Sequence, residues 1–342
     1  MTYKAKLLAS LAFATFFLIA VSSVADDNQN GVNSQINWPS PGPSNFPTIL
    51  SSDVVGHADI TFGSFFNYYR QPIGIDTVVG NGTDWLVENA FTADFLWAFG
   101  IVDVLQLGLV LPIVMYQNGE GRIPIRPPNT DPGAYALSTS TLADIRFNVK
   151  IRFLGTKRID GKTKDPNKRD LGLALDLGLA VPTGDQRNFA GDEGVVFFPN
   201  LIVDFHRCMV SAAINLGARL RSSDSEVYNP SPPPAGTTPH AIIVVGQQGT
   251  FGAGVTGHLL KQRLLLSAEG LGYFEFEDVS NIAFEYRGAV GYVPDKGKAI
   301  TLWLGAGSSV GSDDFVGSPQ VRVFLSLTYA PKEEFADMGG LF

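Results

Sequence analysis

Few residues in this chain combine the types and the spacing that catalysis or metal binding requires. The four histidines are far apart in the sequence, at His57, His206, His240 and His258. None of them lies at a helical or hairpin spacing from Cys208, the single cysteine, or from a carboxylate, so the sequence predicts no zinc site. Ser267 and His258 could pair as nucleophile and base, but a chain of this length offers such pairs by chance. We therefore expect no enzyme activity, no catalytic residue, no metal and no cofactor.

The charged side chains are more informative, because those in alternating segments share one parity. The acids on this parity are Asp59, Glu88, Asp94, Asp144, Asp176, Asp204, Glu269 and Glu285. The bases are Arg146, Lys150, Arg152, Arg219, Arg221, Arg287 and Arg322. The two sets nearly cancel, and a charge that faced lipid would cost a few kcal/mol. We predict that this parity lines a lumen, chiefly through Asp144, Arg146, Lys150, Arg152, Asp176, Arg219, Glu269, Glu285, Arg287 and Arg322.

The elements that must carry these residues are strands. Large apolar side chains alternate with polar or small ones over 143–153 and again over 171–181, which is the period of a strand with two different faces. Ten further segments show the same period, at about 58–70, 85–99, 102–114, 195–206, 209–221, 248–259, 262–275, 281–293, 299–309 and 319–330. Each is about eleven residues or longer, which suits a tilted strand that crosses a bilayer. The predicted fold is all-β, a transmembrane antiparallel up-and-down β-barrel of about 12 strands.

Composition, loop lengths and aromatic residues agree with this interpretation. The chain is 45% hydrophobic and carries a net charge of -8, so a nucleic-acid partner is not expected. Long connections alternate with short ones, as in outer-membrane barrels. Aromatic side chains expected at the membrane interface lie on the outward parity, near one end of alternate strands, at Trp97, Phe99, Phe153, Phe205, Tyr292 and Tyr329.

The two ends of the chain do not follow the strand pattern. Residues 1–25 have the lysines, apolar run and small residues of a signal peptide, with cleavage predicted after Ala25. Residues 26–57 are rich in Asn, Ser and Pro without periodicity, so we predict an extended N-terminal arm or plug on the periplasmic side of the barrel at 58–331. Residues 332–342 form a C-terminal tail.

Three segments carry a resemblance to a known family. They are 142–150, 179–185 together with 189–192, and 317–325. Over about 58–331 the chain resembles the barrel portion of OmpA-family outer-membrane proteins, and more distantly outer-membrane transporters of the phenol-degradation type. The resemblance implies a Gram-negative outer membrane, contact with lipid and lipopolysaccharide, and recognition of the last strand by the barrel assembly machinery. Tyr329 is the expected recognition residue, with Phe342 as the alternative.

Two functions fit these predictions. The first is a passive channel or transporter for small solutes, in which the charged parity lines water. The second is a closed structural or surface-contact barrel, in which these charges pair with one another and outer loops 115–139 and 222–240 meet partners. A soluble exported sandwich is a third possibility, but the belt of aromatic residues argues against it.

Overall fold

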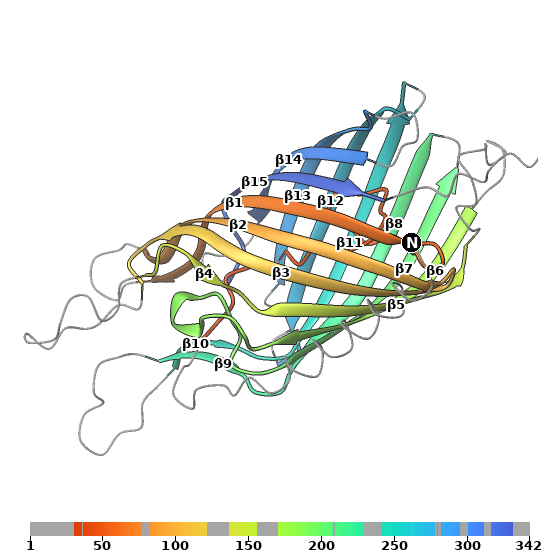
Figure 1. Ribbon diagram of the computed structural model, residues 1–342. Helices are drawn as coiled ribbons and strands as arrows, with labels where there is room; N and C mark the ends of the chain where they lie inside the picture. The colour runs from red at the N-terminus through yellow and green to blue at the C-terminus, as the bar shows by residue number, and fades with distance from the viewer. Residues whose placement is uncertain are drawn as a thin grey trace, which may run out of the picture.

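The computed structural model describes residues 31–35, 37–76, 83–121, 137–155, 170–207, 209–228, 241–260, 262–277, 279, 282–294, 300–310 and 316–330. The predicted signal peptide with its cleavage site, the tail at 332–342 and His240 therefore lie outside the described residues. Figure 1 shows the strands arranged as one tilted barrel.

Twelve strands form the wall of the barrel. They are β1 (Ile60–Asp76), β2 (Thr83–Val102), β3 (Leu105–Asn118), β5 (Ile145–Leu154), β6 (Asp170–Val181), β7 (Val196–Arg207), β8 (Val210–Arg221), β11 (Gln248–Leu259), β12 (Leu264–Glu275), β13 (Ile282–Tyr292), β14 (Ile300–Val310) and β15 (Val321–Tyr329). Each strand pairs antiparallel with the next along the chain, and β1 pairs with β15 to close the ring. The prediction of a closed antiparallel barrel of about 12 strands is confirmed.

The remaining elements are small. The two-residue strand β4 (Thr141–Leu142) adds to β3, and β9 (Ser225–Tyr228) pairs with β10 (Ala241–Val245) in a separate hairpin between β8 and β11. A 3-10 turn covers Gln186–Asn188. Among the described residues no helix is long and apolar enough to span a membrane.

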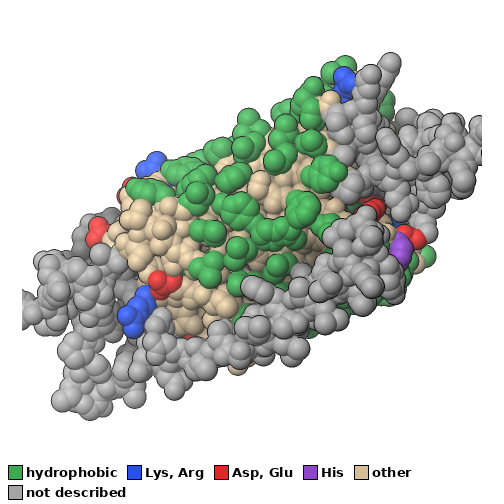
Figure 2. Space-filling view, in the orientation of Figure 1, with side chains coloured by type: hydrophobic (Ala, Val, Ile, Leu, Met, Phe, Trp, Pro, Cys, Tyr) green, Lys and Arg blue, Asp and Glu red, His purple; other side chains and the backbone are tan. Residues whose placement is uncertain are grey.

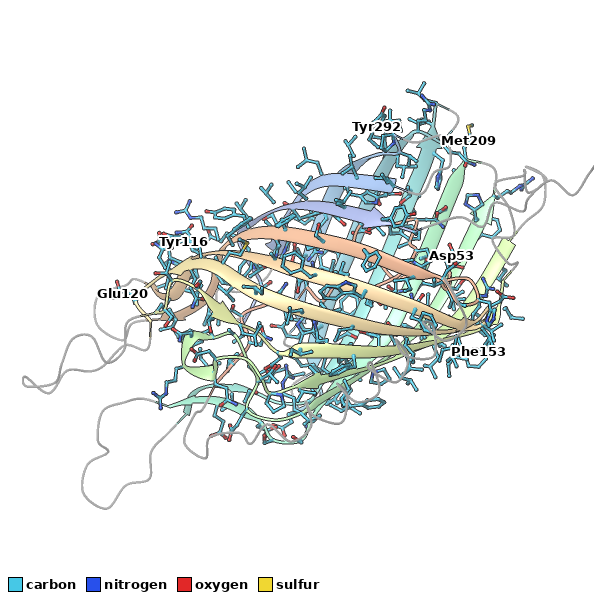
Figure 3. All side chains as sticks on the ribbon, viewed as in Figure 1. Asp53, Tyr116, Glu120, Phe153, Met209 and Tyr292 are labelled. Carbon is cyan, nitrogen blue, oxygen red and sulfur yellow. The ribbon has the colours of Figure 1, made fainter. Side chains whose placement is uncertain are left out.

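The barrel has two ends, which we name by their connections. The loop end carries the connections after β1, β3, β6, β8, β12 and β14, including the β9–β10 hairpin. The turn end carries the connections after β2, β5, β7, β11 and β13, most of which are short. In Figure 3, Tyr116 and Glu120 mark the loop end, whereas Phe153, Met209 and Tyr292 mark the turn end.

The outer face of the wall is apolar, as the alternation predicts. Along β13 exposed and buried side chains alternate from Ile282 to Tyr292, and β15 shows the same pattern up to Leu327. Figure 2 shows hydrophobic side chains gathered over the strands, with charged side chains near the two ends. This distribution suits a bilayer around the middle of the barrel.

We expect a charge on this outer face to be costly. Ile214 lies at mid-strand in β8 and its side chain is 55% exposed. Ile214→Arg should lower the free energy of unfolding by about 2–4 kcal/mol in lipid, because a midplane arginine faces hydrocarbon. Urea unfolding in vesicles would measure the loss. Leu260→Arg, in the β11–β12 turn, is the control, and an equal loss there would contradict the bilayer position.

The inner wall has two sectors. Toward the turn end, strands β12 to β15 and β1 to β3 present a buried apolar cluster of Phe65, Leu96, Val110, Leu265, Ala289, Val293, Trp303 and Phe324. The rings of Phe65 and Phe324 stack with their centroids 5.3 Å apart. Strands β5 to β8 instead present buried polar and charged side chains, among them Asn148, Lys150 and Asp176. The lumen is therefore amphipathic across its width.

Candidate functional site

The N-terminal arm, residues 31–57, lies inside the barrel. Its first part is at the loop end, where the Ser34 backbone N–H donates to the Phe189 carbonyl oxygen at 2.9 Å. Its last part is at the turn end, where the Ala58 N–H donates to the Gly100 carbonyl oxygen at 2.7 Å. The arm is the red-orange segment that crosses the interior in Figure 1. The described part of the arm therefore spans the lumen from the loop end to the turn end.

An apolar contact and two hydrogen bonds hold the arm at the loop end. Val32 is buried in a cluster with Tyr69, Ile73, Leu86, Val87, Ala90, Phe189 and Val245. The Ser34 hydroxyl lies 3.1 Å from the Tyr69 hydroxyl. The Gln35 side-chain amide donates to the Asp94 carboxylate at 2.8 Å. These contacts fix the first residues of the arm against β1 and β2.

Four arginines surround the next part of the arm, and we call them the arginine girdle: Arg146, Arg219, Arg287 and Arg322. The guanidinium carbon of Arg219 lies 4.2 Å from the centroid of the Trp38 ring, and that of Arg146 lies 5.4 Å from it. Arg287 donates to the Asn37 side-chain oxygen at 2.8 Å. The arm thus contacts the guanidinium groups through an indole ring, which attracts a cation to its face, and through an amide oxygen, which accepts a hydrogen bond.

Two carboxylates pair with the girdle. Asp94 accepts from Arg146 at 2.5 Å, and Glu285 accepts from both Arg287 and Arg322 at 2.7 Å. All of these side chains are nearly inaccessible to solvent, at 7% exposure or less. In such surroundings each charge needs its partner, because an unpaired buried charge costs several kcal/mol.

Three further carboxylates hold the part of the arm that lies nearer the turn end. Asp176 accepts from the Ser40 hydroxyl at 3.1 Å. Glu269 accepts from the Thr48 hydroxyl, from the Thr48 N–H at 3.2 Å and from the Ile49 N–H at 3.1 Å. Asp204 accepts from the Ser52 N–H at 2.7 Å and from the Ser52 hydroxyl at 2.8 Å. Each of these three wall acids therefore accepts hydrogen bonds from a donor of the arm.

Neutral and basic groups complete this attachment. Asn215 exchanges two hydrogen bonds with the backbone of Leu50, at 2.8 and 3.0 Å. The Lys150 ammonium donates to the Ser51 carbonyl oxygen at 3.3 Å, and Gln106 accepts from the Val55 N–H at 3.0 Å. The arm is therefore held by wall side chains along its length and forms no strand of the barrel.

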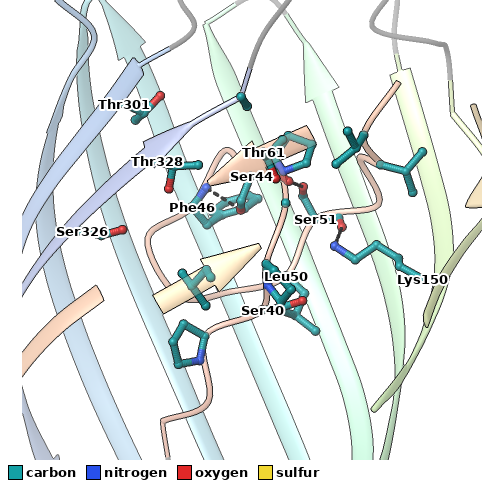
Figure 4. A pocket seen from close by; sticks show the side chains of 18 of the residues that line it. Ser40, Ser44, Phe46, Leu50, Ser51, Thr61, Lys150, Thr301, Ser326 and Thr328 are labelled. Carbon is teal, nitrogen blue, oxygen red and sulfur yellow. Dashed lines mark hydrogen bonds between the residues drawn. The ribbon is translucent and has the colours of Figure 1, made fainter. Parts of the chain in front are cut away.

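A cavity of about 350 Å³ lies between the arm and the wall near the turn end. Phe46, Leu50 and Val55 of the arm line one side, and Phe65, Leu96 and Trp303 of the apolar cluster are among the wall residues. Figure 4 shows Thr301, Ser326 and Thr328 across from the arm, and Lys150 reaching Ser51. The cavity has the size and mixed polarity of a small-molecule site.

The structure places the predicted lumen residues as follows. All ten are buried, at 9% exposure or less. Nine of them lie on the wall strands that surround the arm. Asp144 instead precedes β5 and accepts from the backbone N–H groups of Gly184 at 2.9 Å and Asp192 at 2.8 Å. Its position supports the β6–β7 loop at the loop end.

The β6–β7 loop has its own charge cluster. Asp192 accepts from Arg221 at 3.2 Å and from the Ser225 hydroxyl at 3.1 Å. Burial raises the pKa of the Asp144 carboxyl well above its usual range, and the neighbouring Asp192 carboxylate adds to the rise. Partial burial likewise raises the pKa of the Glu193 carboxyl, with repulsion from Glu226 and Asp224 as smaller causes. The cluster ties the loop to β8 and to the β9–β10 hairpin.

The predicted interface aromatics lie at the turn end of the outer face. Phe153, Tyr292 and Tyr329 are exposed, at 57%, 49% and 44%. Trp97, Phe99 and Phe205 are half-buried. Figure 3 shows Phe153 and Tyr292 at this end. Their positions suit a ring of interface aromatics.

Two histidines contact one serine near the turn end of the barrel. The Ser211 hydroxyl lies 2.7 Å from His206 Nδ1 and 2.8 Å from His258 Nε2, whereas Ser267 bonds to Thr256 at 2.9 Å. In the part of the chain that the structure describes, no group of three or more His, Cys, Asp or Glu side chains is placed to hold a metal ion.

Sequence reasoning missed the residues of the arm itself. Trp38, Thr48 and Ser52 contact the wall through partners more than a hundred residues away in the chain. The one usable signal was composition, since a polar, proline-containing segment can remain extended while its backbone groups bond to side chains.

Comparison with known proteins shows the fold. No family model matches the sequence, and no curated protein matches it either, so the OmpA-family resemblance gains no support from sequence. Among solved structures, an outer-membrane channel from Pseudomonas putida F1 is similar with a TM-score of 0.51 at 12% identity, covering 81% of this chain and 97% of that chain. The toluene transporter TbuX of Ralstonia pickettii has a TM-score of 0.40 at 10% identity, covering 89% of this chain and 99% of that chain. The likeness to the Pseudomonas putida channel shows that the chain has the fold of an outer-membrane barrel.

Proposed function

We propose that this chain is an outer-membrane channel through which small solutes diffuse passively, and that residues 31–57 are its plug. One observation carries the proposal: a segment outside the barrel's strand pairing fills a polar lumen and is held there by side chains. A wall that were only structural could pair its own charges. Here Asp204 and Glu269 instead accept hydrogen bonds from the arm, and Asp176 accepts both from the arm and from Asn148 of the wall.

The apolar outer face and the long loops give the expected orientation. The loop end would face the outside of the cell and the turn end the periplasm, as in bacterial outer-membrane barrels. The channel path would then run from the loop end past the arginine girdle to the cavity near the turn end.

Single-channel recording tests this proposal directly. The mature chain, residues 26–342, is refolded into a planar bilayer beside the same chain without residues 26–57. We expect rare or small current steps from the complete chain and regular, larger steps from the shortened chain. Heat-modifiable gel mobility confirms that both are folded.

A second function is supported by one observation, the buried contact of Val32 with Phe189 and Val245, which joins the arm to the loop end. It favours a closed structural or surface-contact barrel in which the arm braces the outer loops. Silence from both folded chains in the bilayer would reject the channel and support this alternative.

A further inference from the structure

The arginine girdle has more positive than negative charge. Among the described residues, Arg146, Arg287 and Arg322 of the girdle pair with two carboxylates, Asp94 and Glu285, at the level of the arm residues Asn37 and Trp38. Nearer the loop end, Asp192 pairs with Arg221 and Asp144 binds backbone N–H groups. The acids nearer the turn end, Asp176, Asp204 and Glu269, hold the arm. The girdle is therefore a zone of the lumen in which arginines outnumber the carboxylates that pair with them.

The girdle also has unused hydrogen-bond donors. Arg146 Nε and Nη1, Arg287 Nη2, and Arg322 Nη1 and Nη2 are buried and have no hydrogen-bond partner among the described residues. Buried polar groups are normally satisfied, so such donors indicate a missing acceptor. Guanidinium groups bind carboxylate and phosphate in preference to neutral acceptors, because the bonds are charge-assisted.

Apolar side chains lie directly beside the girdle. Phe324 is the next inward residue after Arg322 on β15, and it stacks on Phe65 of β1. This pair belongs to the apolar cluster that continues to Trp303 beside the cavity. A solute whose anionic group lay among the arginines would place the rest of its structure against aromatic rings.

Two residues of the arm already make the polar and aromatic contacts that such a solute would make. Asn37 offers an oxygen to Arg287, and Trp38 places an aromatic ring over Arg219 and against the edge of Phe198, with ring centroids 4.9 Å apart. The polar and apolar parts of these two residues occupy neighbouring positions in the lumen.

We propose that the girdle is a binding site for small organic anions, meaning a carboxylate or phosphate joined to an apolar group, and that such anions compete with Asn37 and Trp38 for it. The inference rests on the proposed function and names its substrate class. A neutral or cationic solute of the same size lacks the group that the free guanidinium donors require.

Two measurements on the complete mature chain test the inference. In proteoliposomes, the entry of hexanoate is compared with that of hexylammonium and of glucose. Hexanoate should enter about tenfold faster than hexylammonium, and Arg287→Gln or Arg219→Gln should each remove most of this preference. The single variants leave Glu285 paired with Arg322. Arg263→Gln, which removes an exposed base in the β11–β12 turn, is the matched control and should retain the preference.

The second measurement does not require the solute to pass through the barrel. Hexanoate should change the tryptophan emission of the complete chain, whereas Trp38→Phe should abolish that change. Glucose entry without any preference for hexanoate, and without a change at Trp38, would overturn the anion site and leave the channel standing. No entry of any solute, in folded protein whose Trp38 does not respond, would reject both.

Discussion

The double variant Asp204→Asn, Glu269→Gln should open far more often than the parent chain in single-channel recordings. Both carboxylates accept hydrogen bonds only from the arm in the contacts described above, through Ser52, Thr48 and Ile49. A charged acceptor makes a bond about twice as strong as a neutral amide does. Losing this extra hydrogen-bond strength at both side chains should weaken the binding of the arm to the wall by about 3 kcal/mol. The fraction of barrels in which the arm is released should then rise on the order of 100-fold.

The control changes the same kind of charge where no arm is present. Glu120 and Glu277 are exposed in connections at the loop end, so Glu120→Gln, Glu277→Gln should conduct like the parent. If the Asp204 and Glu269 variant stayed as quiet as the parent while the chain without residues 26–57 conducted, these carboxylates would not be what holds the arm.

Replacing Glu285 by alanine should cause the largest loss of stability in the barrel. Glu285 accepts from both Arg287 and Arg322 at 2.7 Å, and both arginines are fully buried. Without it, two guanidinium groups lose their shared counter-charge, and breaking a buried pair in this way costs about 3–5 kcal/mol. Urea unfolding followed by tryptophan emission would measure the change.

The comparison for this variant is Glu277→Ala, which removes an exposed acid in the preceding β12–β13 connection and should cost less than about 0.5 kcal/mol. Equal midpoints for the two variants would mean that water or another anion compensates the arginines in the lumen. Added phosphate should then raise the midpoint of the Glu285→Ala chain.

The wall could be predicted from the sequence because its signal is local. In β5, Arg146, Asn148 and Lys150 alternate with Phe147 and Val149, and only one parity can face lipid. The same alternation gave all twelve strands within a few residues at most ends. The β9–β10 hairpin was missed, since strands of four and five residues are too short for a period to be counted.

The site could be predicted only in part, because its contacts join distant residues. The inward charges were assigned by parity, but nothing in their spacing pairs Asn37 with Arg287 or Leu50 with Asn215. The arm has no repeating pattern, and its backbone bonds to side chains instead of to a neighbouring strand. Such pairs of residues are determined by the three-dimensional fold, and no repeating pattern in a single sequence reveals them.

The closure of β1 against β15 limits how the arm can leave. A segment enclosed by an unbroken ring of strands cannot leave between two strands. It must therefore slide along the barrel axis, toward the turn end where it joins β1. Each residue of the arm must then move through the positions now held by the residues that follow it, a shift of roughly 3.3 Å per residue of extended chain. Partial retraction breaks several contacts before the passage clears, which makes intermediates costly. We expect long closed and long open dwell times with abrupt changes between them, instead of rapid flicker.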